Sequence, residues 1–170
     1  MKFLLSAVLL FCGAAVFGQE KHDPGYLPYS QFAPDTAAYL KRMSATDPLT
    51  HEPSFYYNCP AGYVLDDLEI EPRCVWVNFI RNRNEIGSIY LVFESFERTK
   101  KIRSQRGLPP TIILNPISKI TPESDKTLFD GLAVGHTASF LRPWSDELAR
   151  LLKDVQLDFV VYLQRDVPKQ

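Results

Sequence analysis

The sequence predicts an α+β fold, a single domain with a mostly antiparallel sheet of about four or five strands and three or four helices packed against it. Three observations predict this class. Residues 74–96 have the pattern of a β-hairpin, segments on both sides have helical apolar spacing, and residues 156–164 alternate like a strand. The 170 residues, 45% apolar and 23% charged, suffice for one domain with its own core.

The hairpin predicted for residues 74–96 has apolar side chains on both faces. Its arms flank a polar turn at residues 81–85. Because side chains alternate along a strand, the arms divide into two faces. One face has Val75, Val77, Phe79, Ile89, Leu91 and Phe93, and the other has Trp76, Ile80, Tyr90 and Val92. A sheet that is apolar on both faces needs cover on both.

The remaining elements follow from periodicity and from helix-ending residues. Helices are expected over residues 34–45, 60–70, 95–106 and about 143–155, and further strands over 111–117 and 156–164. Residues 128–140 fit a strand with a bulge or a turn-rich loop.

Several single residues carry expectations about these elements. Asp66, Asp67 and Glu69 are expected on the exposed side of the second helix, and Gly107 at the C′ position of the third. Pro116 predicts that its strand ends near a sheet edge.

The first 18 residues are typical of an export signal. Lys2 precedes an apolar run over residues 3–16, and Val16 and Gly18 suit a cleavage site before Gln19. The run is short for a spanning helix, although a retained membrane anchor is the alternative. We therefore expect a signal peptide at 1–18, no transmembrane segment after its removal, and a periplasmic or extracellular location.

The rest of the chain divides into three parts. Residues 19–33 form a leader rich in proline and tyrosine, residues 34–165 form the domain, and residues 166–170 form a polar tail. The prolines predict an extended leader. Its Tyr26 and Tyr29 either dock along the domain, contact a partner, or belong to a loosely packed terminus.

Export changes the expected role of the cysteines. Cys12 would be removed with the signal, so that Cys59 and Cys74 remain. An even pair in an oxidising compartment predicts a disulfide. It would close a loop of about 16 residues and contribute about 3 kcal/mol. The alternative is two buried free thiols.

A basic cluster follows Glu97 without an intervening acid. It either binds phosphate groups, anionic lipid or an acidic partner, or forms the solvated face of a helix. The formal charge of −1 and the lack of interleaved aromatic residues argue against nucleic acid. The cluster consists of Arg98, Lys100, Lys101, Arg103 and Arg106.

The histidines indicate neither a metal site nor another cofactor, because none has two-ligand spacing. His136, with Asp130 and Ser139 nearby, has the residue types of a nucleophilic triad, but no nucleophile elbow is present. A small secreted hydrolase that uses His136 is therefore an alternative, and the sequence favours a protein that is not an enzyme.

Export, without a catalytic motif, favours a binding protein of the cell envelope whose partner is a protein. Aromatic residues outside the predicted sheet supply the candidate contacts. These are Tyr26, Tyr29, Phe55, Tyr56 and Tyr57.

Three segments carry a resemblance to a known group of proteins. They are residues 35–40 (DTAAYL), 64–68 (VLDDL) and 87–93 (GSIYLVF), the last followed by a basic segment and Pro-Pro. Together they resemble small exported proteins of Gram-negative bacteria that have no assigned activity. The resemblance implies a signal peptide followed by one compact α/β domain, and it implies no functional residues.

Overall fold

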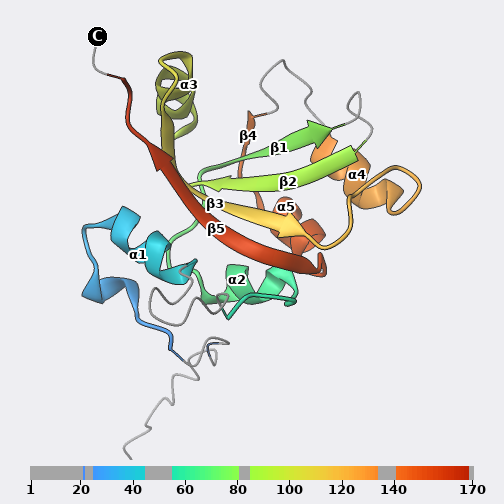
Figure 1. The fold of residues 1–170 in the computed structure, drawn as a ribbon, viewed down its shortest axis with the longest axis horizontal. Coiled ribbons are helices and arrows are strands. Elements are labelled where there is room, and N and C mark those ends of the chain that lie inside the picture. Colours follow the sequence, from blue (N-terminus) through green and yellow to red (C-terminus); the bar gives the residue numbers. More distant parts are fainter. Residues whose placement is uncertain (1–20, 22–24, 45–54, 81–84, 134–140, 169–170) are drawn as a thin grey trace, which may run out of the picture.

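The computed structural model describes residues 21, 25–44, 55–80, 85–133 and 141–168 (Figure 1). In chain order its elements are η1 (Tyr29–Gln31), α1 (Thr36–Met43), α2 (Ala61–Asp67), β1 (Cys74–Ile80), β2 (Glu85–Val92), α3 (Phe96–Ser104), β3 (Leu108–Pro116), α4 (Lys126–Ala133), β4 (Leu141–Pro143), α5 (Asp146–Leu152) and β5 (Leu157–Arg165).

One five-stranded sheet organises the domain. Its strand order is β4-β1-β2-β3-β5, and every neighbouring pair is antiparallel. The predicted α+β class is confirmed. The described residues form five α-helices, one more than the upper number predicted.

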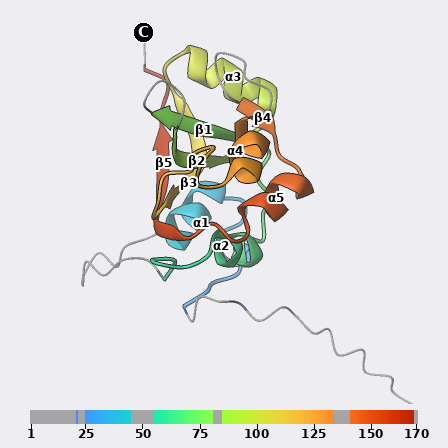
Figure 2. The same ribbon diagram turned by 90° about the vertical axis from the view of Figure 1, so that its right-hand side faces the viewer.

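Each face of the sheet has its own apolar cluster. The main core lies between the sheet and α1, α2, α4 and α5, and it includes Val75, Ile89 and Leu91 from the hairpin. A smaller cluster on the opposite face contains Trp76 and Val92, with Phe96 of α3 packed against it. Figure 2 shows α3 at one end of the domain and α1 and α2 at the other. The two-faced hairpin predicted from its alternation is therefore confirmed.

Strand β5 faces the core with Leu157, Val160 and Tyr162, because its pairing with β3 shifts between Asn115 and Pro116 and places Leu157 on the core side. Val160 is in the main core and Tyr162 packs against it, whereas Phe159, Val161 and Leu163 are exposed. Both rows contain apolar residues, so alternation alone does not reveal which one is covered.

Helix α4 occupies part of the segment for which the sequence predicts a bulged strand or a loop. Asp125 Oδ1 accepts a hydrogen bond from Leu128 N at 2.9 Å and begins the helix. Gly131 is in the helix because α5 packs close to it: a Cβ there would lie 2.5 Å from Leu151 Cδ1. This glycine serves helix packing rather than a turn. Residues 134–140 of the same prediction lie outside the described residues.

The C-terminus of α3 differs by one residue from the expectation. Arg106, with φ 62°, takes the left-handed position expected for Gly107. Gly107 N, the next donor, bonds Ile102 O at 2.9 Å, which is a Schellman ending. Gly107 is needed for close packing, since a Cβ there would lie 2.7 Å from Ile102 Cγ2 and 2.9 Å from Val167 Cγ2.

Strand β3 is central, between β2 and β5, so the edge position expected from Pro116 is wrong. The strand tolerates its prolines because they lie where its pairing with β5 shifts, between Leu108 and Thr111 and between Asn115 and Pro116. The edges are β5 and the three-residue β4, a strand too short for its sequence to predict.

Asp67 is buried, which corrects its expected position on the exposed side of α2. Its side chain has no exposed surface, and its Oδ2 accepts a hydrogen bond from the Tyr56 hydroxyl at 2.9 Å. A buried carboxylate needs such a partner. Here it comes from the turn that precedes α2.

Candidate functional site

The leader docks along its own domain, which is one of the alternatives that the sequence leaves open. Tyr29 and Phe32 pack around the buried Tyr39 of α1, with ring centroids 5.3 Å and 5.7 Å from the Tyr39 ring. Tyr29 N donates to Glu69 Oε2 at 2.8 Å. Tyr26 also packs against the main core, and burial raises the pKa of its hydroxyl. Tyr26 and Tyr29 thus serve the fold.

The second group of predicted contact residues is divided. Tyr56 is fully buried, whereas Phe55 and Tyr57 are 39% and 46% exposed. Phe55 packs edge-on against Tyr56, with ring centroids 5.5 Å apart. Only Phe55 and Tyr57 of this group offer apolar surface to a partner.

The predicted disulfide is absent, because Cys59 and Cys74 are free thiols. Cys74 lies in the apolar cluster under α3, and its Sγ donates to Glu94 O at 3.6 Å. Cys59 lies on the turn before α2, and its carbonyl accepts from Leu157 N at the start of β5. The two side chains belong to different environments, and burial raises the pKa of both thiols.

The candidate catalytic residue His136 lies outside the described residues, as do Ser139, His22 and His51. Asp130 is described, and its carboxylate forms an ion pair with Lys126 one turn earlier in α4.

The basic cluster does not form one surface. Arg103 lies over the ring of Trp76, with its guanidinium carbon 4.2 Å from the ring centroid, and burial lowers its pKa. Lys100 lies over Phe96 at 4.0 Å. Two of the five residues therefore support packing around α3.

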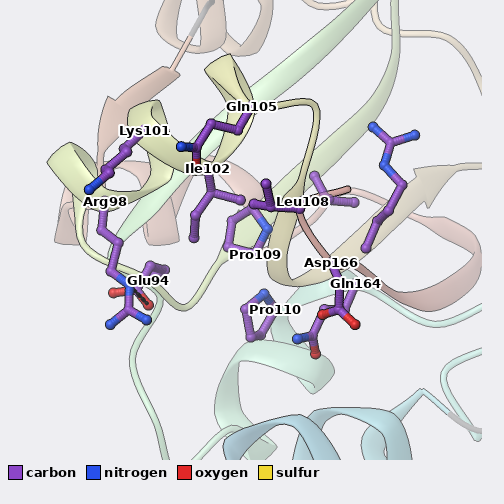
Figure 3. Close-up of a pocket in the computed structure, with 12 residues that line it drawn as sticks. Glu94, Arg98, Lys101, Ile102, Gln105, Leu108, Pro109, Pro110, Gln164 and Asp166 are labelled. Carbon is purple, nitrogen blue, oxygen red and sulfur yellow. Dashed lines mark ion pairs between the residues drawn. The ribbon is translucent and has the colours of Figure 1, made fainter. Parts of the chain in front are cut away.

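Arg98 and Lys101 line a cleft of about 520 Å³ between α3 and the end of β5 (Figure 3). Arg165 of β5 adds a third cation to the lining. Glu94, which pairs with Arg98 at 3.3 Å, and Asp166 add two acids. The apolar part of the lining comes from Ile102, Leu108, Pro109, Pro110 and Val167. Arg106 lines a separate cleft with the chain after β5.

The outward row of β5 is the clearest apolar surface on the sheet. Phe159, Val161 and Leu163 are 43%, 36% and 42% exposed and alternate along one face. They extend the face that α3 covers at its other end. Sequence analysis found the alternation of β5, and only the sheet order shows that this row is on an edge strand.

Charged residues in β5 occur only near its ends, at Asp158 and Arg165. Natural edge strands commonly carry a charge or a proline in the middle, which blocks pairing with another strand. The middle of β5 has neither. It is therefore suited to pairing with a further strand.

Comparison with protein-family models, curated proteins and solved structures found no match. In the part of the chain that the structure describes, every helix is too short or too polar to cross a membrane. The fold defines an α+β domain with one antiparallel sheet, and its candidate surfaces are the β5 row and the α3 cleft.

Proposed function

We propose that this chain is an exported, non-enzymatic binding domain of the cell envelope that holds a protein partner on the outward face and edge of β5. The observation that carries the proposal is the row of Phe159, Val161 and Leu163 on an edge strand. Single exposed apolar residues are common on proteins, but three in a row on one strand face form a continuous surface.

The mode of binding follows from the position of the row. A strand laid beside β5 would bond its free backbone groups, and the apolar row would contact alternate side chains of that strand. The export signal predicted for residues 1–18 supports an envelope location, and the same residues motivate the proposal that the partner is found there.

Replacing Phe159, Val161 and Leu163 together by serine is expected to reduce capture of the partner at least about tenfold, because the apolar contact is lost. The measurement is in-cell crosslinking of the tagged chain, followed by quantitative mass spectrometry of the crosslinked proteins. A stoichiometric partner should be found with the unaltered chain.

The matched control for this experiment is Ile117→Ser. Ile117 is 53% exposed and lies outside β5, so its replacement removes apolar surface without touching the strand. Equal capture by the triple variant and the unaltered chain would contradict the proposed function. So would the absence of any crosslinked partner, whether another protein or a second copy of the chain.

A second candidate function is binding of anionic groups, such as lipid headgroups, in the α3 cleft. It is favoured because Arg165 of β5 lines the same cleft as Arg98 and Lys101 of α3. The two acids in the same lining reduce the attraction, so the first proposal remains preferred.

Replacing Arg98 and Lys101 by glutamate should abolish binding to vesicles of an anionic phospholipid if this second function exists. Binding by the unaltered chain should also weaken steeply with added salt, since exposed charges are screened. Lys119→Glu, at an exposed position outside the cleft, is the control for charge change. Binding that is absent or independent of salt would exclude this function.

A further inference from the structure

We propose that the partner on β5 is a second copy of this chain. Two β5 strands pair antiparallel across a two-fold axis at Val161 and join two five-stranded sheets into one of ten strands. This inference rests on the proposed function, because it takes the β5 row and edge as the binding surface. It adds the identity of the occupant and the register of the pairing.

The first support is the free edge of β5. The strand has nine residues and is last in the sheet order, and β3 is its strand partner within the described residues. In Figure 1 the strand is drawn in red and lies next to β3 at the edge of the sheet. Leu157 N at the start of the strand bonds Cys59 O, and the outer backbone groups beyond it bond either water or a further strand.

The second support is the self-complementary pattern of the strand. In antiparallel pairs, residues directly opposite each other point to the same face. With the axis at Val161, Phe159 lies opposite Leu163 of the second copy, and Val161 lies opposite its own copy. Every exposed apolar residue of the row then meets another one. Moving the axis to Tyr162 would place Asp158 opposite Asp166 of the second copy, which like charges disfavour.

The charges at the ends of β5 select the antiparallel direction. Asp158 is near the start of the strand and Arg165 is its last residue. With the axis at Val161, the pairing ends at Asp158, because Leu157 N already bonds Cys59 O at 2.9 Å. Asp158 then lies opposite Gln164 of the second copy and next to Arg165 of that copy. Opposite charges are thus neighbours at both ends of the pair. A parallel pair in register would place like charges beside each other.

The third support is a row of side chains that crosses the sheet and ends at the axis. Strand register places five residues side by side on the face that α3 partly covers. Within the row, Trp76 stacks on Tyr90 with ring centroids 4.4 Å apart. Leu141, Trp76 and Ile113 are at most 9% exposed, whereas Val161 at the end of the row is 36% exposed. Pairing at Val161 continues the row into the second copy. The row consists of Leu141, Trp76, Tyr90, Ile113 and Val161.

The small area of the contact indicates that the dimer is weak. The exposed parts of the three apolar side chains amount to roughly 200 Å² per copy, against about 800 Å² per partner in a standard interface. Backbone pairing adds to this area without closing the difference. We therefore expect a weak dimer, with a dissociation constant on the order of 10–100 µM.

The first test is sedimentation equilibrium of the purified chain over a concentration series that spans this range. The average mass should rise from 19.4 kDa towards twice that value. Val161→Lys should remain at the lower mass at all concentrations, because a lysine at the axis faces its own copy. Its circular dichroism should match that of the unaltered chain, since Val161 is partly exposed.

The second test determines which residues of the two β5 strands lie opposite each other. Val161→Cys, in a background with Cys12→Ser and Cys59→Ser, should form a disulfide between copies under mild oxidation. Opposite Cα atoms in an antiparallel pair lie about 4.5–5.5 Å apart, within the range of a disulfide. Ile117→Cys in the same background is the control at a more exposed position, and it should remain largely monomeric.

The outcomes separate this inference from the proposed function. A chain that stays monomeric over the whole concentration range overturns the dimer. Suppose instead that the unaltered chain crosslinks to a different protein in cells and the triple serine variant does not. The proposed function then stands, and the occupant of the β5 edge is a strand of that protein. A dimer that persists in Val161→Lys, or that does not crosslink through Val161→Cys, also overturns the inference, because it forms elsewhere.

Discussion

Replacing Tyr39 by alanine is expected to lower the free energy of unfolding by about 4 kcal/mol, because it empties a large buried site. Tyr39 has no exposed surface and is the residue around which the leader packs. Its hydroxyl accepts a hydrogen bond from Glu69 N at 3.0 Å and donates to Asp67 O at 3.3 Å. One side chain therefore joins the leader, α1 and the end of α2.

The same substitution should release the leader. Chymotrypsin is expected to cleave after Tyr29 and Phe32 at least about tenfold faster in Tyr39→Ala, since their ring partner is lost and local opening becomes easier. The measurements are urea unfolding followed by circular dichroism, and mass spectrometry of the cleavage products.

The control is Tyr39→Phe, which retains the ring and removes two hydrogen bonds. It should cost only about 1–2 kcal/mol and leave cleavage of the leader slow. If the leader of Tyr39→Ala resists chymotrypsin as well as that of the unaltered chain, Tyr39 does not hold it.

The second large effect is expected at Asp67. Asp67→Ala should lower the free energy of unfolding by about 3 kcal/mol, because the buried Tyr56 hydroxyl loses its carboxylate acceptor. Asp67→Asn retains an acceptor oxygen and should cost about 1 kcal/mol. The exposed Glu123→Ala should change stability by less than about 0.5 kcal/mol. Chemical unfolding of the three variants measures these differences.

A double-mutant cycle isolates the contribution of the Tyr56–Asp67 contact. Asp67→Ala combined with Tyr56→Phe should cost less than the sum of the two single changes, by about 1–2 kcal/mol, because both single changes remove the same hydrogen bond. Costs that add without coupling would show that the hydrogen bond does not stabilise the fold.

These two sites also explain why three of the five aromatic residues predicted as partner contacts pack within the fold. Tyr26, Tyr29 and Tyr56 contribute to the packing of α1, α2 and the leader. The exposed apolar row is on β5, on the side of the sheet that this packing does not reach. The sequence predicts the contact residues among clustered aromatic side chains, most of them tyrosines. The structure instead leaves exposed a row whose residue types are those of an ordinary core strand.

The elements with a strong local pattern could be predicted from the sequence. The hairpin has apolar alternation on two arms, and α1 and α5 have cap residues, Asp35 and Ser145, whose side chains accept hydrogen bonds from Ala38 N and Leu148 N. The α+β class follows from these elements, since they provide both an apolar sheet and amphipathic helices to cover it.

The candidate site depends on relations between distant segments. Whether Asp67 is exposed is decided by Tyr56. The role of Gly131 is decided by Leu151 of α5. The exposure of Phe159, Val161 and Leu163 depends on β5 being at the edge and on α3 lying over the other end of the sheet. Sequence alone determined which segments form strands and helices, because periodicity and capping are local. Tertiary structure decided which apolar face remains uncovered, because strand order and helix placement are set by contacts between residues far apart in the chain.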